Sequence, residues 1–246
     1  MSKTLDELSV VIPVYDEAAN VADLLGEIEA CLDGRLHYEV IVVDDGSTDD
    51  TLERLRDIRR ERRLPLRILR HARNAGKSAA LRNGIAAARC DWIVTLDGDG
   101  QNDPADIPKL LAAAAASSGR LDLVCGHRFA RQDPGIKRLS SRLANAVRAR
   151  LLEDGIPDTG CGLKLLRRRV FLNLPAFNDM HRFLPALVQR EGGEVMSLAV
   201  NHRPRLRGRS KYGIHNRLWV GIVDLLGVLW LQRRAINPSY EEVTEG

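Results

Sequence analysis

The sequence predicts an α/β fold with a doubly wound, mostly parallel sheet. Short runs of β-branched and apolar residues alternate with segments of helical periodicity through the first 130 residues. Gly- and Asp-rich turns separate the two kinds of segment. The chain has 246 residues, of which 44% are hydrophobic and 28% charged, as in an ordinary globular domain with room for an appendage. Strands joined by helices of this length form a sheet with right-handed crossovers.

Five strands and four helices are expected in this region, in strict alternation. The strands are Ser9–Val14, Glu39–Val43, Arg67–Leu69, Trp92–Leu96 and Asp122–Cys125. Asn20 is expected to cap the first helix, and the second begins in the Ser47–Asp50 cluster. The third helix spans Gly76–Ala88, and the fourth, rich in alanine, runs from Pro104 to Ser117. The polar loops after the strands therefore lie at one edge of the sheet, where such folds bind ligands.

The fourth predicted strand ends in two carboxylates. Asp97 and Asp99 follow it directly, with Gln101 two positions on. Alternate residues of an extended segment point to the same side, so these oxygen ligands meet at one point. Such a set suits Mg²⁺ or Mn²⁺, which keeps coordination positions open for a substrate phosphate. A tight Asp-Gly turn without a metal is the alternative at this stage.

The loops after the other predicted strands also carry polar groups. They hold Pro13, Tyr15 and Glu17 after the first strand, Asp44 and Asp45 after the second, Lys77 after the third, and Gly126, His127 and Arg128 after the fifth. Asp44 or Asp45 could accept hydrogen bonds from a base or ribose, and Lys77 could help to hold a nucleotide. Taken singly, each has a plain reading as a turn former or a solvated side chain. Glycine-rich dinucleotide and P-loop signatures are absent from the sequence.

Several motifs together resemble the family 2 inverting glycosyltransferases of GT-A fold, and among them the dolichol-phosphate mannosyltransferase group with its undecaprenyl-phosphate sugar transferases. The resemblance covers roughly residues 8 to 215. It rests on Val10–Glu17, Val42–Asp49, Asn74–Lys77, Leu96–Gln101, Gly126–Arg128, Lys137–Ser141, Asp158–Lys164 and Arg205–Tyr212.

This resemblance implies roles for individual residues. Pro13, Tyr15, Glu17 and Asp44 would hold the nucleotide, with Asp45, Lys77 and Asp97 beside them; Asp97, Asp99 and Gln101 would hold Mg²⁺ or Mn²⁺. Arg128, Lys137, Arg138 and Ser141 would receive an acceptor phosphate, and Arg205 and Lys211 would close over the diphosphate. Asp99, Arg128, Arg205 and Lys211 are the expected catalytic residues. The substrates would be a nucleotide-diphosphate sugar and a polyprenyl phosphate.

The chemistry supports a phosphate acceptor. A phosphate monoester is largely dianionic at neutral pH, so it can attack an anomeric carbon without a general base, but it needs positive charge to position it. Arg128, Lys137, Arg138 and Arg142 supply this charge before an expected amphipathic helix ending near Leu152, unless they form an ordinary solvated basic face.

The segment 178–183 lacks the acidic pattern that carries the base in relatives with hydroxyl acceptors. Asp179 or His181 could still serve, so transfer to a sugar or another hydroxyl is the alternative. A non-catalytic nucleotide-sugar-binding subunit is the alternative from another class, and a binding-only protein would have less need of Asp97 and Asp99.

The C-terminal part of the chain predicts contact with a membrane surface. The apolar stretch Leu218–Leu231 has 14 residues with Asp224 inside, which is too short to span a bilayer. Trp219 and Trp230 lie near its ends, and Arg217, Arg233 and Arg234 flank it, as in an interfacial helix. A helix buried in the core would give the same string. We therefore expect three parts: a catalytic domain over 1–215, an interfacial helix over 216–236 and a mobile acidic tail over 237–246.

The distribution of charge and the cysteine content also favour a cytoplasmic protein that acts at a membrane surface. Residues 1–119 hold 15 basic and 21 acidic side chains, and residues 120–246 hold 22 basic and 12 acidic ones. A basic second half suits a phosphate-bearing acceptor or an anionic membrane. Aromatic residues are few, so nucleic acid is not an expected partner. Scattered cysteines and a polar start without a signal peptide favour a cytoplasmic protein at the inner face of the membrane, with a membrane-protein partner or a homo-oligomer possible.

Overall fold

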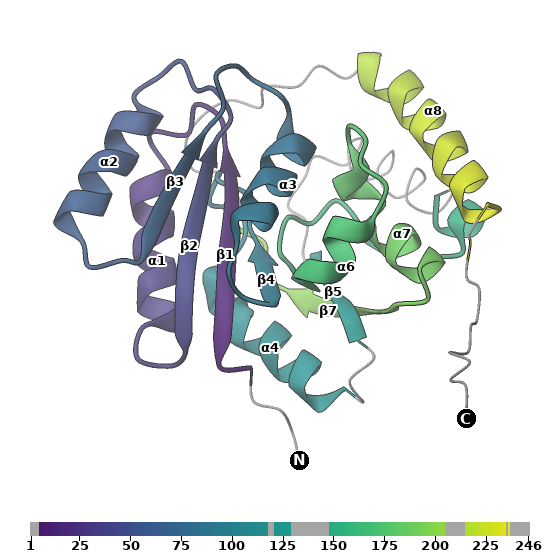
Figure 1. Ribbon diagram of the computed structural model, residues 1–246, viewed down its shortest axis with the longest axis horizontal. Helices are drawn as coiled ribbons and strands as arrows, with labels where there is room; N and C mark the ends of the chain where they lie inside the picture. Colours follow the sequence, from purple (N-terminus) through teal and green to yellow (C-terminus); the bar gives the residue numbers. More distant parts are fainter. Residues whose placement is uncertain (1–4, 118–120, 129–147, 205–214, 235, 237–246) are drawn as a thin grey trace, which may run out of the picture.

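A seven-stranded sheet forms the centre of the computed structural model, which describes residues 5–117, 121–128, 148–204, 215–234 and 236 (Figure 1). The strand order is β3-β2-β1-β4-β6-β5-β7. The strands are β1 (Glu7–Val14), β2 (His37–Asp44), β3 (Leu66–Arg70), β4 (Trp92–Thr95), β5 (Leu121–Arg128), β6 (Lys164–Arg167) and β7 (Glu194–Val200). β6 runs antiparallel to β4 and β5, and every other neighbouring pair is parallel. The expected mostly parallel α/β sheet is confirmed.

Helices cover both faces of the sheet. In chain order they are α1 (Val21–Leu32), α2 (Thr51–Glu61), α3 (Lys77–Ala87), the 3-10 helix η1 (Pro104–Asp106), α4 (Ile107–Ala116), α6 (Arg168–Asn173), the 3-10 helix η2 (Met180–Arg182), α7 (Leu184–Arg190) and α8 (His215–Gln232). The four helices expected in the first half are all present. Asn20 is the N-cap residue of α1 as expected, but its side chain makes no capping hydrogen bond and instead donates to Glu17 Oε2 at 2.6 Å.

Alternation along the strands divides the core in two. On β1, Val10 and Ile12 face α1, α2 and α4, whereas Val11 faces the side of α3, α6, α7 and α8. On β2, Val42 faces the side of α1, α2 and α4, and Val43 faces the side of α3. Because both faces are covered, these strands read as continuous apolar runs, which is typical of parallel sheets.

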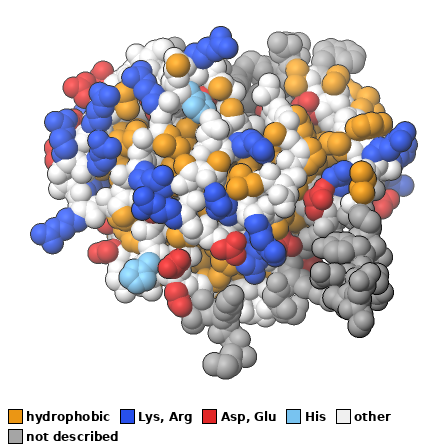
Figure 2. Space-filling view, viewed as in Figure 1, with side chains coloured by type: hydrophobic (Ala, Val, Ile, Leu, Met, Phe, Trp, Pro, Cys, Tyr) orange, Lys and Arg blue, Asp and Glu red, His pale blue; other side chains and the backbone are white. Residues whose placement is uncertain are grey.

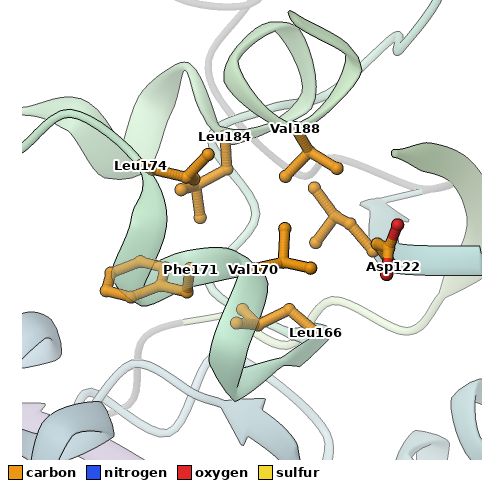
Figure 3. Close-up of a pocket in the computed structure, with 8 residues that line it drawn as sticks. Asp122, Leu166, Val170, Phe171, Leu174, Leu184 and Val188 are labelled. Atoms are coloured by element: carbon orange, nitrogen blue, oxygen red, sulfur yellow. The ribbon is translucent and has the colours of Figure 1, made fainter. Parts of the chain in front are cut away.

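In the second half of the sheet, β5 was expected from the sequence, but β6 and β7 were not. β6 has only four residues and enters between β4 and β5, and β7 forms the far edge beside β5. α6 and α7 pack on this part of the sheet. Figure 3 shows the contact, in which Phe171 of α6 and Leu174 just after it meet Leu184 and Val188 of α7, with Asp122 of β5 at the margin.

The topology brings the carboxyl ends of six strands to one edge, which lies at the top of Figure 1 for β1 to β3. β6 runs the other way, so its amino end at Lys164 reaches the same edge, together with the segment 158–163 that precedes it. This segment therefore joins the loops in which the functional residues are expected.

The predicted interfacial segment forms α8, which lies at the upper right of Figure 1. Gln232 at its end donates to the Leu152 carbonyl at 3.0 Å, and Arg190 Nε donates to the Leu231 carbonyl at 2.9 Å. Among the described residues, no helix combines the length and apolarity that crossing a bilayer requires.

Candidate active site

Asp97 lies at the centre of the strand-end edge, directly after β4. Its carboxylate contacts the ammonium of Lys77, the first residue of α3. Burial opposes ionisation of Asp97, but the charges of Lys77, Lys164 and Arg128 outweigh it and hold the pKa of Asp97 below its usual value. The structure thus brings Lys77 and Asp97 together, and Asp97 is ionised at neutral pH.

Gly162 packs against the other side of Asp97. A Cβ atom added at Gly162 would lie 2.4 Å from both Cγ and Oδ1 of Asp97, which is closer than real contacts allow. Two hydrogen bonds fix the surroundings: Thr95 Oγ1 donates to the Gly162 carbonyl at 2.7 Å, and the Asp97 amide donates to Asn102 Oδ1 at 3.1 Å. The absence of a side chain at residue 162 therefore leaves the space that the Asp97 carboxylate occupies.

Asp99 and Gln101 continue the same loop. The Gln101 amide donates to Asp99 Oδ1 at 3.2 Å, and the Gln101 side chain donates to the Arg203 carbonyl at 3.4 Å. Arg203 in turn forms ion pairs with Glu27 and Asp103, each at 2.7 Å. The loop that carries Asp99 is therefore tied to the segment that leaves β7.

These residues fit a divalent cation that shares its ligands with substrate. Within the described parts of the chain, no group of three His, Cys, Asp or Glu side chains is placed to hold a metal ion. Asp97 and Asp99 lie two positions apart in the loop after β4 and could offer two carboxylates, while Mg²⁺ or Mn²⁺ would take its other ligands from phosphate oxygens and water. The ammonium of Lys77 provides a positive charge beside the Asp97 carboxylate.

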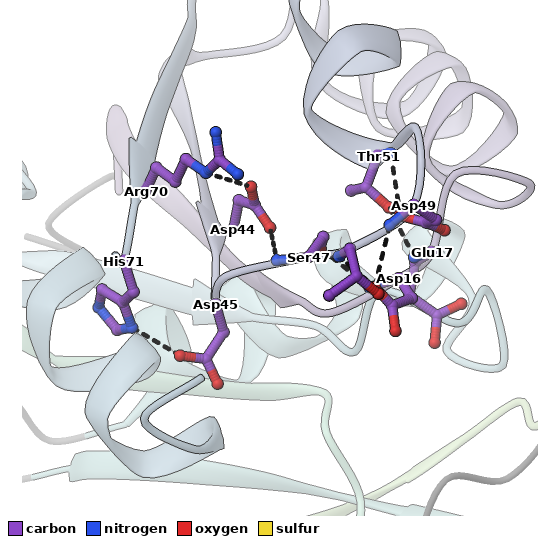
Figure 4. Close-up of polar contacts among 10 residues, drawn as sticks. Asp16, Glu17, Asp44, Asp45, Ser47, Asp49, Thr51, Arg70 and His71 are labelled. Atoms are coloured by element: carbon purple, nitrogen blue, oxygen red, sulfur yellow. Dashed lines mark hydrogen bonds and ion pairs between the residues drawn. The ribbon is translucent and has the colours of Figure 1, made fainter. Parts of the chain in front are cut away.

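Asp44 ends β2, Asp45 follows it, and the two side chains point in different directions (Figure 4). Asp44 is fully buried; it accepts from the Ser47 amide at 2.9 Å and lies 3.5 Å from Arg70 Nε. Asp45 accepts from the amides of Ala75 and Gly76 at 2.9 and 2.8 Å and lies 2.6 Å from His71 Nδ1. Asp45 thus orders the loop that starts α3 and carries Lys77.

The loop after β1 is held by the loop after β2. Asp16 adopts a left-handed conformation with φ of 48°, and its Oδ1 accepts from the Thr48 amide at 2.7 Å. In return, the Asp16 amide donates to Ser47 Oγ at 2.9 Å, as Figure 4 shows. The Glu17 amide donates to Thr51 Oγ1 at 2.8 Å. This exchange leaves the expected nucleotide contacts Pro13, Tyr15 and Glu17 partly exposed at the sheet edge.

Arg128, at the end of β5, is held by Asp158. Its Nε donates to Asp158 Oδ2 at 2.6 Å and its Nη2 donates to Oδ1 at 2.9 Å. Burial disfavours the guanidinium charge, but Asp158 outweighs it and raises the pKa of Arg128. One edge of the guanidinium is used in this pair, so a phosphate would have to bind the remaining donors.

The segment before β6 is further fixed by two buried cations. Arg148 pairs with Asp154 at 3.4 Å and also donates to Thr159 Oγ1. Lys164 donates to the carbonyl of Thr159 at 3.1 Å and to that of Cys161. These contacts hold the run that places Gly162 against Asp97 and Asp158 against Arg128.

Comparison with known proteins identifies the family. The sequence profile of glycosyl transferase family 2 matches residues 9–174, more than half of the chain. The chain belongs to this family. The match covers the loops after β1 to β4, the end of β5 at Arg128 and the segment before β6, which together form the site described above.

Relatives within glycosyl transferase family 2 include prenyl-phosphate enzymes. The chain is 37% identical over 238 residues, 95% of its length and 70% of the relative's, to dodecaprenyl-phosphate galacturonate synthase of Rhizobium johnstonii. It is 35% identical to undecaprenyl-phosphate 4-deoxy-4-formamido-L-arabinose transferase of Aeromonas hydrophila subsp. hydrophila, with coverage of 84% of this chain and 63% of that protein. This chain therefore spans less than two thirds of the second relative.

Solved structures of similar fold include glucosyl-3-phosphoglycerate synthase from Mycobacterium tuberculosis in complex with Mn²⁺, UDP-glucose and glycerol 3-phosphate. The TM-score is 0.72 with 19% identity, over 96% of this chain and 83% of that one. The same enzyme with Mg²⁺ and UDP gives a TM-score of 0.70. The expected GT-A-like fold is confirmed.

Five of the residues expected at the site belong to two segments between described elements. Lys137, Arg138, Ser141, Arg205 and Lys211 lie outside the described residues. Their assignment to acceptor phosphate and diphosphate stays a prediction.

Gly162 and Asp158 contribute to the site although no role for them is predicted from the sequence. The run Asp158–Lys164, with its two glycines, was a signal for them, since glycines close to a polar site often admit a close approach. Asp179 and His181 are the two candidates for a general base in transfer to a hydroxyl acceptor. Asp179 precedes η2 and has a φ of 61°. His181 lies in η2, and its Nδ1 is 2.8 Å from Ser78 Oγ.

Proposed function

We propose that this chain transfers a sugar from a nucleotide-diphosphate sugar to a polyprenyl phosphate, with inversion, at the cytoplasmic face of a membrane. The arrangement of Lys77, Asp97 and Asp99 at the carboxyl end of the sheet carries this proposal. The names of the two prenyl-phosphate relatives support the choice of acceptor.

In the proposed reaction, an oxygen of the acceptor phosphate attacks the anomeric carbon. The bond between that carbon and the diphosphate oxygen breaks, and the nucleoside diphosphate leaves with the electron pair. A phosphate dianion carries no proton that must be removed, so the step needs no general base. The chain's contribution is to hold the two anionic substrates in line and to stabilise the leaving charge.

The residues have distinct roles in this scheme. Asp97 and Asp99 would hold Mg²⁺ or Mn²⁺, which neutralises the diphosphate when bound. Lys77 lies next to Asp97 and can move its ammonium onto the diphosphate, which adds a second positive charge at the leaving group. Asp45 orients the loop that carries Lys77. Arg128, fixed by Asp158, keeps a guanidinium near Asp97 on the acceptor side.

The outer face of α8 supports association with a membrane surface. Val220, Val223, Leu226 and Trp230 lie on one side of the helix and are 45–65% exposed, whereas Val228 on the opposite side is 1% exposed. Figure 2 shows hydrophobic side chains over α8 at the upper right, next to a group of basic ones. Arg233 and Arg234 at the end of α8 are exposed and suit anionic lipid headgroups.

The test is transfer of a radiolabelled sugar to lipid. Purified chain, Mn²⁺ and a panel of UDP- and GDP-sugars are incubated with undecaprenyl phosphate in detergent, and the lipid product is separated by chromatography and identified by mass spectrometry. Asp99→Asn is the inactive control. A labelled lipid that releases the sugar on mild acid supports the proposal. Donor binding together with transfer only to sugar hydroxyls would refute the acceptor assignment.

A further inference from the structure

Arg182 lies beside the candidate site and has no role in the scheme above. It ends η2, and its side chain is exposed. η2 is fixed to the site, because His181 Nδ1 lies 2.8 Å from Ser78 Oγ and Ser78 follows Lys77 in α3. Lys77 contacts Asp97, so η2 is linked to the carboxylate at the centre of the site through two side-chain contacts and the start of α3.

The charge of Arg182 also reaches α8. Asp224 of α8 is close enough to feel the charges of both Asp179 and Arg182. Burial and Asp179 raise the pKa of Asp224, and the guanidinium of Arg182 opposes this rise. Asp224 lies between the buried side of α8, which carries Val228, and the exposed apolar side. Arg182 therefore stands at the boundary between the polar site and the helix proposed to lie on the membrane.

The donors of Arg182 differ from those of Arg128. Among the described residues, the Arg182 side chain has no hydrogen bond and no ion pair, whereas Arg128 forms a two-point pair with a largely buried Asp158. Arginine binds phosphate through two parallel N–H donors, and a free edge of the guanidinium is required for that geometry.

We propose that Arg182 binds the phosphate of the acceptor, a prenyl phosphate whose chain enters the membrane beside α8. The inference rests on the proposed function and adds a residue to it. An amphiphile with a dianionic head needs a cation where the apolar surface meets the polar site, and Arg182 is placed there. Arg128 then contributes to the electrostatic field around Asp97, and Arg182 contacts the acceptor phosphate directly.

A water-soluble acceptor separates this role from membrane binding. Geranyl phosphate is used with the donor identified for the wild-type chain, and steady-state kinetics are measured in the absence of lipid. Arg182→Ala should raise the acceptor KM about 10- to 100-fold, as expected for a lost charge-assisted contact. Donor affinity, measured by calorimetry without acceptor, should be unchanged. Arg182→Lys should recover part of the loss, because one point charge replaces a two-point contact.

Two further variants distinguish the role of Arg182 from a structural one. Asp224→Asn removes the neighbouring carboxylate; if the Arg182→Ala defect came only from leaving Asp224 uncompensated, the double variant Arg182→Ala/Asp224→Asn would restore the acceptor KM, and the proposal would be overturned. Arg63→Ala removes an exposed arginine near the amino end of β3 and should leave all constants unchanged. An unchanged acceptor KM in Arg182→Ala would also overturn the proposal. A wild-type chain that binds donor but never uses a prenyl phosphate would instead refute the proposed function, and the inference with it.

Discussion

Replacement of Gly162 by alanine should displace Asp97 without unfolding the protein. The new Cβ would lie 2.4 Å from Cγ and Oδ1 and 2.6 Å from Oδ2 of Asp97. Since non-bonded carbon atoms are at their optimum near 3.5–4.0 Å, the carboxylate has to move by about 1 Å or more. A misplacement of that size at a reacting centre costs about 100-fold in rate, whereas overpacking costs about 1–3 kcal/mol of stability.

The assay measures both quantities. We expect kcat/KM for sugar transfer to fall about 100-fold, with weaker binding of nucleotide plus Mn²⁺ by calorimetry and only a modest fall in the melting temperature. Gly193→Ala is the matched control: its Cβ would lie 2.7 Å from Val188 Cγ1 and 2.8 Å from Asp122 Oδ2, next to the amino end of β7 and away from the site. That variant should lose stability but keep its kcat/KM. Wild-type catalysis in Gly162→Ala would refute the role assigned to this glycine.

The remaining predictions concern the metal, a buried ion pair, a pH dependence and the membrane. Asp99→Asn should abolish Mn²⁺-dependent turnover at an unchanged melting temperature; full activity in EDTA would contradict this. Arg128→Ala should lower the free energy of unfolding in urea by about 3–5 kcal/mol, because Asp158 is left charged and buried, and adding Asp158→Asn should recover part of the loss. The folded-state pKa of Asp224 is raised, so its ionised form lowers stability above that pKa; Asp224→Asn should raise the melting temperature at pH 7–8, and the difference should vanish as the pH falls below the ordinary Asp value of about 4. Trp230→Ser should reduce sedimentation with anionic liposomes, and equal binding of this variant would argue against α8 as the contact.

The half of the fold built from β1 to β4 could be predicted from the sequence because its signals are local. The apolar runs of β1, β2 and β4 lie between loops rich in Asp and Gly, and those loops end up at one edge of the sheet. β6 gave no such signal: four residues from Lys164 to Arg167 begin and end with a cation and are followed at once by α6. Its place between β4 and β5 depends on long-range pairing.

In the site, too, residues that follow a strand directly could be predicted, whereas contacts between distant segments could not. The carboxylates Asp97 and Asp99 were expected from their place after a strand. The contact of Asp97 with Gly162 joins residues 65 positions apart, and no periodicity encodes it. The pairing of Arg128 with Asp158 likewise depends on the return of the chain from β5 to β6.

The late position of β6 in the chain has a consequence for biosynthesis. β4, with all four residues buried, pairs with β1 on one side and with β6 on the other. While the ribosome is adding residues 96 to 163, the second edge of β4 has no partner strand, although β1 to β4 are complete. An exposed apolar strand edge is a template for pairing with other chains. The nascent protein thus carries an uncovered apolar strand edge in this interval, and because non-local pairing is slow, any factor that shields this edge until β6 arrives would reduce aggregation.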